Sequence, residues 1–86
     1  MFVILTYDVH QKRVGKIFKT CRRYLHAVQR SVFEGTLTEG QIERMKKELA
    51  ACIDPHYDAV SIYVLGSIKY AQRHELGISR SFDGVL

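Results

Sequence analysis

The chain has 86 residues, enough for one domain and too few for two. A chain of this length buries only about 60–65% of the surface that it exposes when unfolded, so the core of one protomer is modest. Hydrophobic residues make up 47% of the chain, which favours a dimer that buries additional apolar surface. The formal net charge of +4 favours acidic partners such as nucleic acid.

The apolar pattern disfavours a membrane-spanning or secreted protein, and the cysteines disfavour a disulfide-bonded one. No run approaches the roughly 20 apolar residues that cross a bilayer, and the apolar start lacks the basic region of a signal peptide. Cys21 and Cys52 both fall on apolar helical stripes. We therefore expect reduced core thiols in a cytoplasmic protein, and a disulfide between them is the less favoured alternative.

The first predicted element is a strand at the start of the chain. Residues 2–5 form a continuous β-prone apolar run, which is typical of a central strand buried on both faces. The run ends in Tyr7 and Asp8. A carboxylate at the exit of a central strand lies at the rim of the core, close to water. Taken alone, Asp8 is more ordinary as a helix cap or a turn residue than as a catalyst.

A helix follows, with an apolar face and a basic face. Its apolar residues recur at spacings of three and four, at Val14, Ile17, Phe18, Cys21 and Leu25. Most other positions are basic: Lys12, Arg13, Lys16, Lys19, Arg22 and Arg23. No acidic residue lies between Asp8 and Glu34, so the helix has no carboxylate of its own to neutralise this face. The pattern favours contact with phosphates over an ordinary solvated face, and it says nothing about sequence specificity.

Residues 26–37 are β-rich and predict either one long bent strand or two short strands with a kink near Arg30 and Ser31, and we favour two. Both side chains could bind a phosphate, and an edge arginine and a ladder serine are equally ordinary. Thr38 and Gln41 then have the spacing of a capping box. The helix that it begins carries two expected surface pairs, Glu43 with Lys47 and Arg44 with Glu48, and Asp54-Pro55 ends it.

A second strongly apolar strand is predicted at residues 59–65, ended by Gly66. Asp58 precedes it and is expected to be a turn or cap residue, and His10 is expected to be a loop histidine. The tail contains a possible further strand around residues 74–78. The other histidines show no spacing typical of a zinc site.

The order of elements predicts an α+β fold. A single domain spanning residues 1–86 would form a ferredoxin-like βαββαβ sandwich with an extra C-terminal strand, two helices covering one face of an antiparallel sheet. The other face would be open. Association of two copies through their sheet faces is the simplest way to cover it.

Three segments carry a resemblance to a known family: Tyr7-Asp8-Val9 with Lys12-Arg13 shortly after, residues 28–35, and residues 58–63. At these spacings, in a chain of this length, the chain resembles the CRISPR-associated endoribonuclease family, the small second Cas protein (Cas-two) of the spacer-acquisition machinery. The resemblance covers residues 1–65. It implies a role in antiviral defence.

The resemblance implies a symmetric homodimer in which residues 66–86 contact the partner protomer. It also implies that Asp8 of each protomer meets its mate at the two-fold axis and binds Mg²⁺ or another divalent cation, as one or two carboxylates commonly do. Tyr7, Arg13 and Phe33 match positions that the family places around this catalytic site. The nucleic-acid-binding residues that we expect are Lys12, Arg13, Lys16, Lys19, Arg23, Arg30 and Ser31.

Two functions follow from the resemblance and the charge pattern. The first is a Mg²⁺-dependent endonuclease that cleaves RNA or DNA through Asp8. The second is a non-catalytic dimeric scaffold that holds duplex DNA for the CRISPR integrase (the Cas-one type subunit). A third class, a regulatory module with a small-molecule pocket between protomers, is disfavoured because the sequence has no Gly-rich turn near a helix start.

Overall fold

The computed structural model describes residues 1–67 and 70–78. They form two helices and five strands in the predicted order, and the extra strand expected around residues 74–78 starts earlier, at Tyr70. The elements are β1 (Phe2–Asp8), α1 (Gln11–Arg22), β2 (His26–Gln29), β3 (Val32–Thr36), α2 (Glu39–Cys52), β4 (Ala59–Ser67) and β5 (Tyr70–Gly77). The two predicted strands on either side of Arg30 and Ser31 are thereby confirmed. No helix among these residues has the length and apolar character to span a bilayer.

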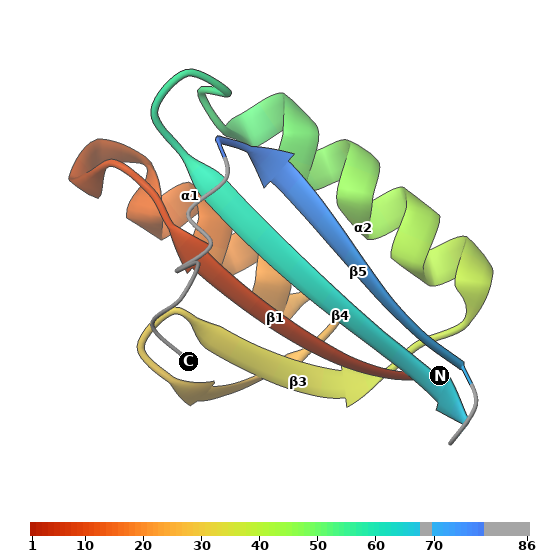
Figure 1. Ribbon diagram of the computed structural model, residues 1–86. Helices are drawn as coiled ribbons and strands as arrows, with labels where there is room; N and C mark the ends of the chain where they lie inside the picture. Colours follow the sequence, from red (N-terminus) through yellow and green to blue (C-terminus); the bar gives the residue numbers. More distant parts are fainter. Residues whose placement is uncertain (68–69, 79–86) are drawn as a thin grey trace, which may run out of the picture.

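The five strands form one sheet in the order β2-β3-β1-β4-β5, and each neighbouring pair is antiparallel. Both helices lie on the same side of the sheet, as Figure 1 shows. This is the predicted α+β sandwich with an extra strand. That strand pairs with β4 of its own chain. Contact of residues 66–86 with a partner stays a prediction, and residues 68–69 and 79–86 lie outside the described residues.

The core lies between the sheet and the helices. It is built from alternate residues of the central strands and from the inner faces of α1 and α2, including Val3, Leu5, Phe33, Ile62, Ile17, Met45 and Leu49, all fully buried. The expectation that β1 is buried on both faces is wrong within one protomer. Phe2 is 39% exposed and Ile4 is half-buried, because both helices cover the opposite face. Figure 1 is seen from this uncovered side.

The helix ends show which local predictions were right. Thr38 and Gln41 form the predicted capping box, and α2 ends before Asp54-Pro55. His10, expected to be a loop histidine, is the N-cap of α1, and its Nδ1 accepts the backbone N–H of Lys12 at 3.1 Å. The predicted basic helix is shorter than its apolar stripe, since α1 ends at Arg22 while Leu25 lies buried beyond it.

The predicted surface pairs of α2 are wrong. Glu43 binds Lys46 at 3.4 Å instead of Lys47. Glu48 binds Arg23 at 2.7 Å and the hydroxyl of Tyr24, both from the end of α1, instead of Arg44. Glu43 thus keeps a partner on its own helix, one residue nearer than predicted, whereas the partners of Glu48 come from the segment that follows α1. The contacts of Glu48 link that segment to α2.

Two smaller features complete the fold. Gly66, expected to end the strand, lies inside β4 where the pairing with β5 shifts register between Leu65 and Ser67. It therefore lies at a bulge and not at a strand end. Cys21 and Cys52 are both free thiols, as expected, and burial raises the pKa of Cys21 to about 12.

Candidate active site at the end of strand β1

A hollow of about 620 Å³ lies where β1 ends, between the first turns of α1 and the turn that joins β2 to β3. The predicted residues Tyr7, Asp8, Arg30 and Ser31 all line it, together with Val9, Gln11, Val14, Gly15 and Phe18. Asp8 and Arg30 are exposed, and Tyr7 and Ser31 are half-buried. The fold therefore brings the predicted metal ligand together with two of the predicted phosphate-binding residues.

The turn between β2 and β3 is held against the end of β1. Ser31 has a φ of 54°, in the left-handed region that side chains other than glycine rarely adopt. Its carbonyl accepts the backbone N–H of Tyr7 at 3.1 Å. This hydrogen bond fixes the position of the β2–β3 turn relative to Tyr7, the residue before Asp8. The unusual backbone of Ser31 is thus supported by its neighbours at the rim of the hollow.

Three aromatic rings lie beneath and beside the hollow. Tyr7 stacks on Phe33 with ring centroids 6.1 Å apart, and Phe18 meets Phe33 edge-on at 5.3 Å. Phe33 is fully buried, so the structure places this predicted site residue below Tyr7 and away from solvent. Burial raises the pKa of the Tyr7 hydroxyl, with a smaller contribution from Cys21. The cluster makes a rigid support for the end of β1.

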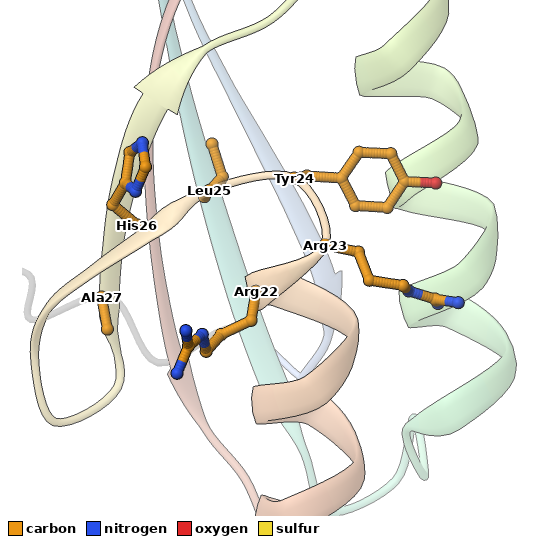
Figure 2. Close-up of a pocket in the computed structure, with 6 residues that line it drawn as sticks. All are labelled: Arg22, Arg23, Tyr24, Leu25, His26 and Ala27. Carbon is orange, nitrogen blue, oxygen red and sulfur yellow. The ribbon is translucent and has the colours of Figure 1, made fainter.

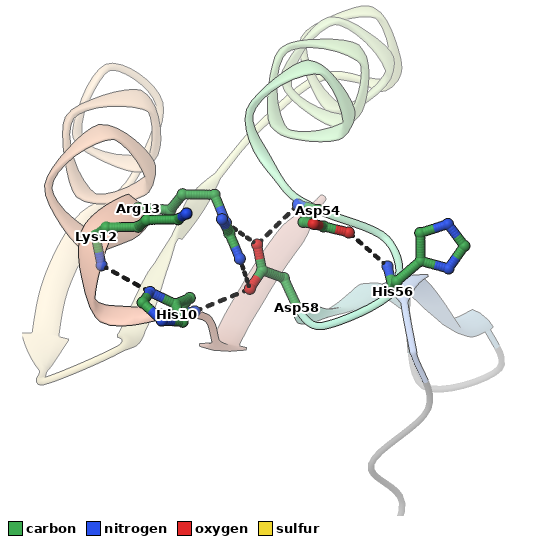
Figure 3. Close-up of polar contacts among 6 residues, drawn as sticks. All are labelled: His10, Lys12, Arg13, Asp54, His56 and Asp58. Atoms are coloured by element: carbon green, nitrogen blue, oxygen red, sulfur yellow. Dashed lines mark hydrogen bonds and ion pairs between the residues drawn. The ribbon is translucent and has the colours of Figure 1, made fainter.

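Arg13, the remaining predicted catalytic residue, does not line the hollow. Its Nε lies 2.5 Å from Oδ2 of Asp58 and its Nη2 lies 3.0 Å from Oδ1, as drawn in Figure 3. The carboxylate of Asp58 is fully buried and holds this guanidinium in a two-bonded pair. The expectation that Asp58 is only a turn or cap residue is therefore incomplete, because it is the ion-pair partner of a predicted site residue.

The basic side chains of α1 divide into two groups. Lys12, Lys16 and Lys19 are exposed. Arg13 and Arg23 instead pair with Asp58 and Glu48, so carboxylates from other elements neutralise part of the predicted basic face.

At the other end of α1, residues 22–27 line a second hollow of about 520 Å³, shown in Figure 2. The side chains of Arg22 and Arg23 point in opposite directions, with Arg23 directed toward α2. The guanidinium of Arg22 lies over the ring of Phe18, 5.9 Å from its centroid. Both arginines therefore already have partners within the fold.

A divalent metal fits the position of Asp8. The side chain is exposed at the end of a central strand, and strand alternation places it on the uncovered face, opposite the buried Val3 and Leu5. A carboxylate with access to water is what Mg²⁺ requires, since this ion keeps most of its waters and takes one or two carboxylates. Among residues 1–67 and 70–78, no three His, Cys, Asp or Glu side chains cluster as metal ligands.

Comparison with known proteins assigns the family. Residues 1–73 match the family described as CRISPR associated protein Cas2. The chain is 41% identical over 81 residues to the CRISPR-associated endoribonuclease Cas2 of Dictyoglomus turgidum, covering 94% of this chain and 93% of that protein. It is 44% identical over 86 residues to the protein of the same name from Thermotoga maritima, covering 100% and 99%.

A solved structure agrees with the sequence relatives. The crystal structure of Streptococcus pyogenes Cas2 superposes with a TM-score of 0.71 at 36% identity, covering 77% of this chain and 87% of that one. The likeness therefore extends from the sequence to the fold. The chain belongs to the CRISPR-associated Cas2 family.

Proposed function

We propose that this chain is a metal-dependent endonuclease of CRISPR spacer acquisition, acting as a homodimer that uses Asp8 of both protomers. The observation that carries the proposal is the position of Asp8, exposed at the exit of the central strand on the face that no helix covers. The names of the relatives, which describe endoribonucleases, support the same reaction class. The substrate is an RNA or DNA phosphodiester.

The uncovered sheet face supports the dimer. Phe2 and Leu65 are 39% and 41% exposed, and Ile4 and Tyr63 lie half-buried beside them. These side chains belong to β1 and β4, which pair in the register Phe2 to Leu65 and Ile4 to Tyr63. A second copy covering this face would bury that apolar surface and bring the two β1 strands together. Asp8 lies on the same face and would approach its mate.

Two groups of residues would carry out the chemistry: the Asp8 carboxylates of the two protomers and the residues that line the hollow. A bound Mg²⁺ would polarise a phosphodiester oxygen and lower the pKa of a coordinated water. Asp8 holds the ion. Arg30 and Ser31, which line the same hollow as Asp8, would bind the phosphate that is cleaved. Tyr7, the residue before Asp8, stacks on the ring of Phe33 and would hold the end of β1 in place.

A paired measurement tests the enzyme function. Mg²⁺-dependent cleavage of single-stranded RNA and duplex DNA is compared for wild type, Asp8→Asn and the control Glu43→Gln, an exposed carboxylate on α2. We expect Asp8→Asn to abolish cleavage while binding is retained, and Glu43→Gln to behave as wild type. Equal cleavage by Asp8→Asn and wild type would contradict the proposal.

A second function is favoured by a separate observation. The side chains of Lys12, Lys16 and Lys19 are exposed on α1. Exposed lysines can bind a phosphate backbone without any catalytic residue. The dimer would then be a scaffold that holds duplex DNA for the Cas-one type integrase subunit. Wild-type binding of duplex DNA without cleavage of either substrate would establish this function in place of the first.

A further inference from the structure

The carboxylate of Asp58 is fully buried immediately before β4, beside the end of β1. It accepts four hydrogen bonds, two on each oxygen (Figure 3). Oδ1 accepts the backbone N–H of His10 at 2.8 Å and Nη2 of Arg13 at 3.0 Å. Oδ2 accepts Nε of Arg13 at 2.5 Å and the backbone N–H of Asp54 at 2.8 Å. One side chain therefore joins the start of α1 to the segment that follows α2.

These bonds fix Asp8 from two directions. Along the chain, His10 is the second residue after Asp8, and its N–H is held by Asp58. Across the sheet, Asp8 pairs with Ala59, the residue next to Asp58. The turn that leaves β1 is thus attached to the same short segment that β1 faces across the ladder. A shift of Asp58 would move the backbone of Asp8 from both sides.

The main chain of Asp58 is also fixed, by the end of β5. Its carbonyl accepts the backbone N–H of Ile78 at 2.9 Å. Gly77 has a φ of +81°, and a Cβ built on it would lie 1.9 Å from that carbonyl oxygen. Only glycine permits this approach. Asp58 is therefore held in place through its backbone while its carboxylate holds its neighbours.

We propose that Asp58 is a positioning residue for Asp8, acting through its ion pair with Arg13 and through the turn at His10. The inference rests on the proposed function, in which Asp8 must reach a metal shared with its mate. It also gives Arg13 a positioning role in place of a direct contact with nucleic acid. Outer partners that orient a metal ligand commonly change metal affinity by about 10–100-fold when they are removed.

The test uses the full chain and two readouts that do not depend on cleavage. The variants are Asp58→Asn, which keeps the shape and removes the charge, and Arg13→Lys, which removes the two-bonded fork. The matched control is Glu48→Gln, which makes the same carboxylate-to-amide change in the Arg23 pair at the other end of α1. Calorimetry measures the Kd for Mn²⁺ without substrate, and hydrogen exchange measures protection of the backbone amides of residues 8–10.

We expect Asp58→Asn and Arg13→Lys to raise the Kd for Mn²⁺ by about 10-fold or more and to speed exchange at residues 8–10. Glu48→Gln should change neither. A folded Asp58→Asn protein with wild-type Kd and wild-type exchange overturns the inference. If Asp58→Asn does not fold, Arg13→Lys decides by the same two measurements.

Failure of the proposed function has a different signature. In that case Asp8→Ala binds Mn²⁺ as tightly as wild type, so Asp8 is not the ligand. Exchange at residues 8–10 then decides the positioning role. Faster exchange in Asp58→Asn but not in Glu48→Gln supports it, and equal exchange in both overturns it.

Discussion

The guanidinium of Arg13 and the carboxylate of Asp58 form a two-bonded ion pair across the end of the sheet, between residues 45 positions apart in sequence. The Arg13 side chain is 18% exposed and that of Asp58 is fully buried. A buried carboxylate is stable in such a place because all of its acceptor positions are used, here by the arginine and two backbone N–H groups. Removing one partner leaves the other charge uncompensated.

The first prediction is a loss of stability in acid that depends on Asp58. The hydrogen bonds from Arg13, then those from the backbone of Asp54 and His10, hold the pKa of Asp58 below its ordinary value of 3.8 and outweigh its burial. Because the folded pKa is the lower one, the stabilisation is complete above about pH 4 and is lost as the pH falls toward the folded pKa.

Urea unfolding between pH 7 and pH 2.5 measures this effect in wild type and Asp58→Asn. At pH 7 we expect the variant to be less stable by about 3 kcal/mol, the usual result of breaking a buried pair. The difference should shrink as the pH falls below about 4. A constant difference across the whole range would show that the charge of Asp58 contributes nothing.

The second prediction separates packing from chemistry at Phe33. This ring is fully buried between Tyr7 and Phe18. Phe33→Leu should lower the free energy of unfolding by about 1 kcal/mol, since the change nearly conserves volume, whereas Phe33→Ala should lower it by about 3–5 kcal/mol. Cleavage per folded molecule by Phe33→Leu should stay close to wild type. A loss of about tenfold or more in that rate, with the fold intact, would give the ring a catalytic role.

The third prediction concerns the turn at Ser31. Its φ of 54° opposes the preference of any residue with a Cβ, at a cost of about 1–2 kcal/mol. Ser31→Gly should therefore leave the protein as stable as wild type or up to about 1 kcal/mol more stable. Ser31→Val should destabilise it, because a branched side chain tolerates this backbone least. Thermal unfolding of the two variants decides, and equal melting temperatures would contradict the expectation.

The fourth prediction divides the basic residues of α1 by their partners. Lys16, Lys19 and Arg23 are all exposed, but the guanidinium of Arg23 is bound to Glu48 at 2.7 Å. Neutralising both lysines with Gln should reduce the slope of log affinity against log salt by roughly two units for duplex DNA. Arg23→Gln should reduce it by less than either lysine. Fluorescence anisotropy over a range of salt measures the slopes, and an unchanged slope in the double lysine variant would place nucleic acid elsewhere.

Much of the fold could be predicted from the sequence, because local signals and apolar periodicity indicate the same helices and strands. The capping box at Thr38, the stop at Asp54-Pro55 and the break at Arg30 and Ser31 depend on neighbouring residues alone. The burial of β1 on one face only was not predicted, because an apolar run does not show how many of its faces are covered within one chain. The exposed Phe2 marks the difference.

The candidate site, like the fold, was predicted only in part. Asp8, Arg30 and Ser31 were each predicted as site residues from their places at strand ends, but their gathering around one hollow was not predicted. The pairing of Arg13 with Asp58 was missed, because 45 residues separate them. The order of the strands does contain a signal that predicts this pairing. The start of an antiparallel β4 must lie beside the end of β1, so an acid before one and a base after the other are brought together.

The outer strand β2 has a consequence for how copies of the molecule avoid polymerising. It has only four residues, all of them exposed, and its pairing with β3 shifts register between Ala27 and Gln29. A short, irregular border offers a poor template for another strand, so end-to-end growth into fibres is discouraged on this side.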